Sequence, residues 1–288
     1  MERQGDFSDF KVRFLANLCH NCAECFYACQ YAPPHEFAVN LPKALEQIRL
    51  ESYRRYAWPK PLAMLFNRNG LVAAIGFVAA LFFFWPPVAA GDFYGVISHR
   101  TMVAIFGAIS IFVILALAMG LRRFWRESGG EFDVGALRQS SADVLRLRYL
   151  GGARRWFHHF TFYGFALCFA ATSVAAFYHY ALGWIAPYGY FSLPVLLGSA
   201  GGVGLLIGPA GLLWLRRDGG MGVAFLVLLF VTSATGLLLL ALRETAAMPA
   251  LLEIHLAVVL ALLITLPYGK FVHGIYRWAA LVRYSGIK

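Results

Sequence analysis

Six runs of about 20 mostly apolar residues constrain this chain most, because each is long enough to cross a bilayer as a helix. Only 14% of the residues are charged, whereas soluble domains carry about 25%. The sequence therefore predicts an all-α membrane protein with six transmembrane helices. The predicted spans are Gly70–Ala90, Thr101–Leu121, Phe160–Trp184, Leu193–Leu215, Met221–Leu242 and Pro249–Tyr268, the last running on past Lys270. The fourth span carries Gly201, Gly202, Gly204 and Gly208, which suits close helix packing.

The basic residues predict how these spans are oriented. Of the 25 lysines and arginines, 23 lie in the N-terminal segment, the C-terminal tail and the two connections on the same side of the spans. Because basic loops stay in the cytoplasm, both termini are expected there. The net charge of +10 then reflects topology and suits anionic lipid headgroups, and we expect no nucleic-acid partner.

Four of the five cysteines precede the first span, in the segment CHNCAECFYACQYAPPHEF. Cys19, Cys22, Cys25 and Cys29 have the C-x2-C-x2-C-x3-C spacing of bacterial ferredoxins. No secretory signal precedes them, so a reducing compartment and a metal are expected rather than disulfides. We favour a 4Fe-4S cluster in a small ferredoxin-like cytoplasmic segment. The alternatives are a zinc site, which more often uses two separated C-x2-C pairs, and thiols without metal.

The single cysteine motif leaves two ways to complete a cluster. In two-cluster ferredoxins the fourth cysteine of each motif ligates the other cluster. Either these four cysteines close on one cluster, or a partner motif lies upstream of Met1. The polar start of the chain favours an incomplete domain.

Five of the eight histidines lie on only two of the predicted spans. The 18 residues from His255 to His273 make a whole number of helical turns, so both side chains are expected to point the same way. The 21 residues from His158 to His179 leave those directions within about 60°. Because the two spans run antiparallel, His158 would lie level with His273 and His179 with His255.

This pattern predicts one or two haem b groups, each held by a pair of axial histidines. The pairs are His158 with His273 and His179 with His255, and helix irregularity leaves His159 as the alternate to His158. Ionisable residues inside a membrane are costly, which favours function over hydrogen bonding between helices, the alternative. We expect small residues of the third span to make room for a porphyrin, and His99 to lie at the surface. The small residues are Gly164, Ala166 and Ala170.

The chain divides into an iron–sulfur segment at 1–57, an interfacial linker at 58–69 and a six-helix haem b domain at 70–288. Two cytoplasmic stretches are predicted to be partly helical. Leu41–Tyr56 is amphipathic and suited to the membrane surface. Val134–Leu150 is either a solvated connector or a docking surface.

Three stretches of the chain resemble the tricarballylate/citrate utilisation protein B family. They are the cysteine segment with its continuation to Pro59, then RRWFHHFTFYGFALCFAATSVAAFYHY, then LPYGKFVHGIYRWAALVRY. The resemblance implies a bacterial inner-membrane electron carrier that combines iron–sulfur centres with haem b. It implies a partner, an FAD-dependent dehydrogenase for tricarballylate or a related tricarboxylate, and delivery of its electrons to quinone.

The sequence departs from that family in two places. The family has an earlier cysteine-rich segment for a second cluster, so we expect that cluster to have been lost with a missing N-terminal segment. The connection between Leu150 and Arg154 is shorter than in the family, which affects the expected docking surface.

The chain is therefore interpreted as the electron-transfer component of a dehydrogenase–quinone system, not as a stand-alone enzyme. The main alternative is a transporter or sensor with a structural four-cysteine metal site and histidines that relay protons or bind metal. The predicted spans between Gly70 and Leu242 carry no charged residue, which counts against transport. A third alternative is a passive anchor whose redox centres belong to a partner.

Overall fold

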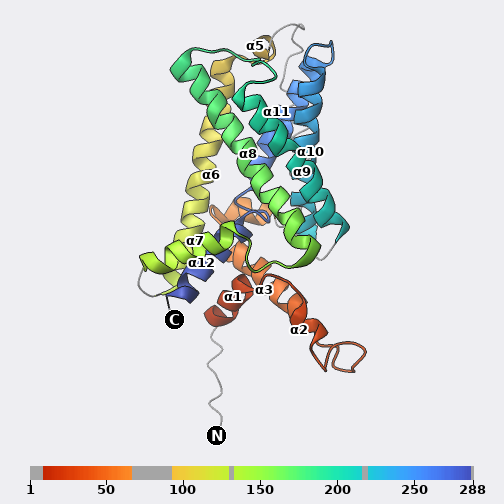
Figure 1. Ribbon diagram of the computed structural model, residues 1–288. Coiled ribbons are helices and arrows are strands. Elements are labelled where there is room, and N and C mark those ends of the chain that lie inside the picture. Colours follow the sequence, from red (N-terminus) through yellow and green to blue (C-terminus); the bar gives the residue numbers. More distant parts are fainter. Residues whose placement is uncertain (1–8, 67–92, 130–132, 216–219, 287–288) are drawn as a thin grey trace. The chain divides into compact units, whose positions relative to one another are not determined.

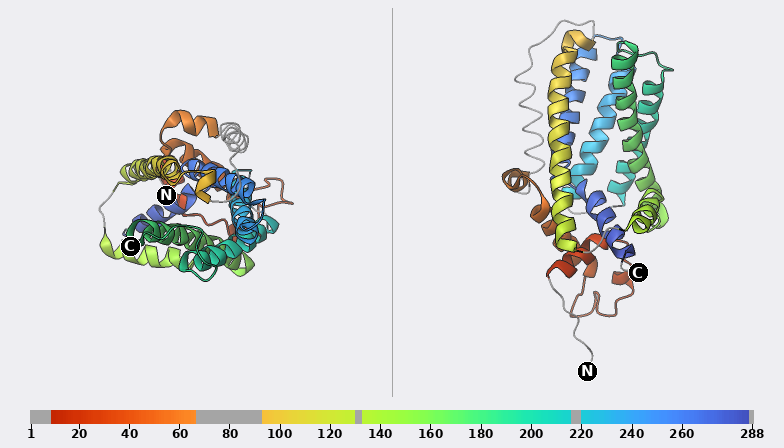
Figure 2. Two further views of the ribbon diagram at one scale, coloured as in Figure 1. Left: turned by 90° about the horizontal axis from the view of Figure 1, so that it is seen from above. Right: turned by 90° about the vertical axis from the view of Figure 1, so that its left-hand side faces the viewer.

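The computed structural model describes residues 9–66, 93–129, 133–215 and 220–286, which form helices and turns without a strand (Figures 1 and 2). Five helices are long and apolar enough to cross a membrane, namely α6, α8, α9, α10 and α11, which makes this a multi-pass membrane protein. The predicted span Gly70–Ala90 lies outside the described residues. The elements are α1 (Asp9–Leu18), α2 (Glu24–Tyr27), α3 (Leu41–Tyr56), α5 (Phe93–Val96), α6 (His99–Ser128), α7 (Val134–Leu145), α8 (Gly152–Leu182), α9 (Leu193–Trp214), α10 (Gly220–Leu242), α11 (Met248–Thr265) and α12 (Val272–Ser285).

The chain folds into two compact units. The cysteine unit comprises Met1–Arg68, Ile114–Gly151 and Leu266–Lys288. The bundle unit comprises Asn69–Val113 and Gly152–Thr265. Four of the predicted spans correspond to α6, α8, α9 and α10. Most of their ends differ from the prediction by a few residues, but the C-terminal end of α6 and the N-terminal end of α8 extend further into the basic connection.

Glycines let α8 and α9 of the bundle unit run side by side at short range (Figures 1 and 2). A Cβ on Gly201 would lie 2.8 Å from the Cys168 nitrogen and 2.8 Å from the Gly164 oxygen. A Cβ on Gly208 would lie 2.5 Å from the Thr161 nitrogen. The expected close packing at these glycines is confirmed. Gly164 belongs to this interface, so the expectation that it makes room for a porphyrin is wrong.

Gly201→Ala is expected to lower the unfolding temperature of the detergent-solubilised protein, because the new methyl group meets the α8 backbone. Overpacking of this kind costs about 1–3 kcal/mol. Gly198→Ala is the matched control on the same helix, because its Cβ would lie 3.6 Å from the Ala171 Cβ, an ordinary contact. Thermal unfolding followed by circular dichroism checks both variants. Equal unfolding temperatures for the two would contradict the assignment.

The rest of the bundle unit packs in chain order, α9 on α10 and α10 on α11. Ser233 on α10 is buried and donates its hydroxyl to the Gly202 oxygen of α9 at 2.6 Å. A buried apolar cluster joins α5 to α10 and α11, and its members are Val96, Leu239, Met248 and Leu252. These contacts hold the histidine-bearing helix α11 against α10.

The cysteine unit is built from caps and aromatic contacts. The Asn40 side chain accepts a hydrogen bond from the Lys43 amide at the start of α3, which has the predicted bounds Leu41–Tyr56. The Asp133 carboxylate caps α7 by accepting from the Gly135 and Ala136 amides. Rings from α3, α6 and α12 pack on one another at 5.4–5.6 Å between centroids, and they belong to Tyr56, Phe124 and Tyr276.

The sixth predicted span is interrupted. Helix α11 ends at Thr265, and α12 begins at Val272 after a run of turns. Pro267 has no amide hydrogen to donate and disfavours helical geometry in the residue before it, which explains the break. The expected continuous helix from His255 to His273 is therefore wrong. The argument that both imidazoles share one helix face fails with it.

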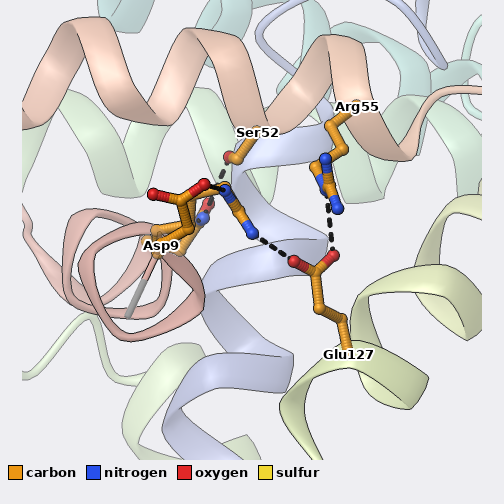
Figure 3. Close-up of polar contacts among 6 residues, drawn as sticks. Asp9, Ser52, Arg55 and Glu127 are labelled. Atoms are coloured by element: carbon orange, nitrogen blue, oxygen red, sulfur yellow. Dashed lines mark hydrogen bonds and ion pairs between the residues drawn. The ribbon is translucent and has the colours of Figure 1, made fainter. Parts of the chain in front are cut away.

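An ionic contact ties the end of α6 to α1 and α3 within the cysteine unit (Figure 3). The Glu127 carboxylate accepts from the Arg13 guanidinium and, at 3.1 Å, from Arg55 Nε. Arg13 also lies 3.6 Å from the Asp9 carboxylate, whose side chain is 96% exposed, whereas that of Glu127 is 23% exposed. Glu127 is therefore the stronger of the two carboxylate partners, because solvent screens exposed pairs.

Glu127→Gln is expected to destabilise the protein by about 1–3 kcal/mol, since it removes charge-assisted hydrogen bonds to two arginines. Asp9→Asn is the matched control, with an expected effect below about 1 kcal/mol for an exposed pair. Chemical denaturation in detergent gives the difference. An Asp9→Asn effect as large as that of Glu127→Gln would contradict this ranking.

Candidate metal centres

The four motif cysteines lie in the loop between α1 and α3 that includes the short helix α2. All four are free thiols, and Cys19, Cys22 and Cys29 are partly buried while Cys25 is exposed. Asn21 and Ala23, on either side of Cys22, have positive φ angles of 56° and 65°. Residues with side chains rarely adopt this conformation, and such strain gathers at functional sites. The backbone therefore turns sharply at the second cysteine, as a loop that wraps around a group requires.

The thiols are neighbours without reaching ligating distance. Burial, together with the charges of Cys19 and Cys22, raises the pKa of the Cys25 thiol. The Asn21 amide donates to the Cys19 Sγ at 3.4 Å. Among the described residues, no three or more His, Cys, Asp or Glu side chains are placed to hold a metal ion. The structure thus places three of the predicted ligands, Cys19, Cys22 and Cys25, close enough for their charges to interact.

Two cations converge on Cys19 from other helices. Arg49 of α3 is 2% exposed and donates from Nη1 to the Cys19 carbonyl oxygen at 2.7 Å. Its Nη2 is buried without a hydrogen-bond partner among the described residues. Arg277 of α12 is half-buried, and its guanidinium carbon lies 5.9 Å from the centre of the Tyr149 ring. The Tyr149 ring lies 5.9 Å from the ring of His20, the residue after Cys19, so Arg277 is near the cysteine loop. Burial and the Arg49 charge lower the pKa of Arg277 to about 10.

This arrangement fits an anionic group at the cysteine loop. No carboxylate in the described part of the chain forms an ion pair with Arg49 or Arg277, and buried charges require a partner of opposite sign. An iron–sulfur cluster held by four thiolates carries negative charge, so it supplies that partner. Four soft donors and two uncompensated cations are the residues that such a cluster needs. The sequence motif indicated the thiols but not the arginines.

A second pair of side chains follows the arginines along the same two helices. Tyr53 lies four residues after Arg49 on α3, and His273 lies four residues before Arg277 on α12. Tyr53 is buried, and its hydroxyl lies 3.1 Å from the His273 Nδ1. Four residues advance a helix by about 6 Å and return to the same face. The predicted haem ligand His273 is thus about one helical turn from the cations beside Cys19.

In the bundle unit, the His255 ring is held between α10 and α11. Thr235 Oγ1 lies 3.0 Å from the His255 Nδ1 and also lies 2.8 Å from the Val231 oxygen and 3.0 Å from the Thr232 oxygen. When the one hydrogen of that hydroxyl goes to a carbonyl oxygen, His255 Nδ1 is the donor, and Nε2 keeps the lone pair that a metal requires. A Cβ on Gly236 would lie 2.8 Å from the His255 Cε1, so the ring occupies the space of a missing side chain.

His179 lies against His99. The two imidazoles stack with centroids 3.6 Å apart and planes at 19°. His99 is half-buried as the first residue of α6. The His179 Nδ1 is buried without a hydrogen-bond partner among the described residues. Two histidines at the ends of neighbouring spans were the signal that the sequence interpretation overlooked.

Contacts at the N-terminal end of α8 distinguish His158 from His159, the two candidate haem ligands there. His159 stacks on the exposed Tyr163 ring at 5.7 Å and lies 6.3 Å from the exposed Trp156 ring. His158 instead has a buried Nδ1. Buried imidazole nitrogens suit ligation better, which favours His158 over its alternate. His158 and His273 belong to different units.

Comparison with known proteins matches both parts of the chain. A family model described as citrate utilization protein B covers residues 58–288, and one described as citrate utilization protein B Fer4-like domain covers residues 2–55. The chain is 45% identical over 323 residues to citrate utilization protein B of Escherichia coli, covering 99% of this chain and 85% of the relative. No solved structure matches the chain. The four motif cysteines fall in the Fer4-like match, and the candidate haem ligands fall in the other.

Proposed function

Because the chain belongs to the citrate utilisation protein B family and begins with a Fer4-like domain, we propose that it is a membrane electron-transfer subunit. Its electrons come from the reduced FAD of a partner dehydrogenase that oxidises citrate, tricarballylate or a related tricarboxylate. Cys19, Cys22, Cys25 and Cys29 would hold a 4Fe-4S cluster, which together with haem b would supply the one-electron chemistry between that flavin and a membrane quinone. The flavin loses two electrons and two protons, and the quinone gains the same.

The observation that carries the proposal is the register of α3 and α12. Arg49 and Arg277 lie beside the cysteine loop, and Tyr53 and His273 meet one turn further along. A protein serves electron transfer by fixing the distance between redox centres and the polarity around them. The cysteine loop lies beside α3 and α12, and these two helices also carry the potential haem ligand His273 and its partner Tyr53 within one compact unit, which meets that requirement.

Haem b, when bound, supplies the one-electron chemistry of the membrane part, and we assign its axial ligands to four histidines. These are His158, His179, His255 and His273, of which His255 presents Nε2 and His273 uses Nδ1 toward Tyr53. Metal-bound histidines commonly engage their second nitrogen in a hydrogen bond, which Thr235 and Tyr53 provide here. We further propose that the protein lies in a bacterial inner membrane with both termini in the cytoplasm, as its basic loops favour.

The direct test is a dithionite-reduced minus air-oxidised spectrum of the full-length protein in detergent, with a pyridine haemochrome count and assays for iron, sulfide and zinc. A b-type α-band together with iron and sulfide beyond the haem supports the proposal. One zinc per chain without haem would overturn it in favour of a transporter or sensor. Haem without sulfide would restrict the function to the membrane part.

A further inference from the structure

The cations beside the cysteine loop indicate how the site works, and this inference rests on the proposed function. We propose that the buried Arg49 and the half-buried Arg277 form a cationic pair that raises the reduction potential of the iron–sulfur cluster. The pair belongs to helices that precede and follow the membrane spans, 228 residues apart in the sequence (Arg49 to Arg277). Neither arginine is a ligand, and both act through their charge on the group that the thiolates hold.

The charge balance of the site supports this role. A cluster bound by four thiolates gains one further negative charge when it accepts an electron. A nearby fixed cation therefore stabilises the reduced form more than the oxidised form, and partial burial strengthens the effect because solvent screens it less. Cluster potentials respond to net charge and hydrogen bonding around the sulfur atoms.

The two arginines are held in place by contacts that do not neutralise them. Arg49 is anchored by a carbonyl oxygen, and its second nitrogen stays buried without a partner in the described residues. Arg277 lies over the Tyr149 ring, while the Asp143 carboxylate nearby accepts from the Tyr149 hydroxyl at 2.9 Å and from Arg148. The Asp143 carboxylate, which is buried, is thus committed to Tyr149 and Arg148. The positive charge beside Cys19 remains available to the cluster.

A raised reduction potential also affects the direction of electron flow. A cluster whose reduced form is stabilised is a better acceptor from a flavin hydroquinone and a poorer donor to low-potential partners. The arginine pair therefore makes the cysteine loop an entry point for electrons, which then leave toward the His273 side of the same unit.

An EPR-monitored redox titration of full-length Arg277→Gln in detergent tests the inference. We expect the equilibrium constant for cluster reduction to fall at least about tenfold, which for a one-electron couple is 59 mV. Arg277→Lys keeps the charge and should recover most of that shift. Arg54→Gln is the matched control, because Arg54 lies on α3 in the same unit but is exposed. Its potential should equal that of the unchanged protein.

The outcomes separate this inference from the proposed function. An Arg277→Gln protein with a full cluster and an unchanged potential would overturn the inference alone. Equal shifts in Arg277→Gln and Arg277→Lys would also overturn it, because shape rather than charge would then matter. If Arg277→Gln loses its cluster, recovery in Arg277→Lys supports the charge requirement, and loss in both overturns it. An unchanged protein without iron and sulfide would overturn the proposed function, and this inference with it.

Discussion

Cys22→Ser is expected to remove the proposed iron–sulfur cluster. Serine replaces a soft thiolate, which suits iron, by a hydroxyl that stays protonated at neutral pH. Cys22 also lies where the backbone turns between two residues of positive φ. We expect sulfide and non-haem iron in the purified protein to fall by more than about tenfold, since even the loss of outer contacts costs metal sites about that much.

Cys168→Ser is the matched control for this experiment. Cys168 is the one cysteine outside the motif, and it lies on α8 against Gly201 in the bundle unit. Serine fills nearly the same volume there, so iron, sulfide and the EPR signal should stay at the level of the unchanged protein. Equal iron and sulfide in the two variants would refute the assignment of the motif as the cluster site.

We expect His255→Ala to lower the haem content of the protein. The substitution deletes an imidazole whose Nδ1 lies 3.0 Å from Thr235 Oγ1 and whose space is kept by Gly236. We expect the pyridine haemochrome count to fall to about half if two haems are bound, and to background if one is bound. A full haem content in this variant would exclude His255 as a ligand.

His179→Ala and His99→Ala identify the opposite ligand of that haem. We expect the His179 variant to lose the same spectral component as the His255 variant, and the His99 variant to keep it. The stacked imidazoles make this comparison sharp, since the two rings lie 3.6 Å apart and only one is assigned as a ligand. Loss of that component in His99→Ala but not in His179→Ala would transfer the assignment to His99.

Much of the fold could be predicted from local sequence. Apolar runs of span length located α6, α8, α9 and α10 with small errors at their ends, and the glycines of α9 correctly indicated close packing against a neighbouring helix. The error came at Pro267, where hydrophobicity continued but the helix did not. Apolar composition shows which segments of the chain prefer lipid to water, whereas a continuous helix also requires an unbroken series of amide donors. The histidine alignment built on a continuous helix failed for that reason.

The candidate metal centres show the same division between what the sequence indicated and what the fold decided. Local spacing and composition indicated which residues are candidate ligands, namely the four motif cysteines and the histidines of two helices, and they determined that the chain is a membrane protein. Only the tertiary structure decided that Arg49 bonds the Cys19 carbonyl with Arg277 near the same loop, that Tyr53 meets His273, and that His179 stacks on His99. These contacts join residues far apart in the chain, so they depend on where helices end and how they pack. Ligand chemistry is a property of single residues, whereas the charge and hydrogen bonding around a ligand belong to the assembled fold.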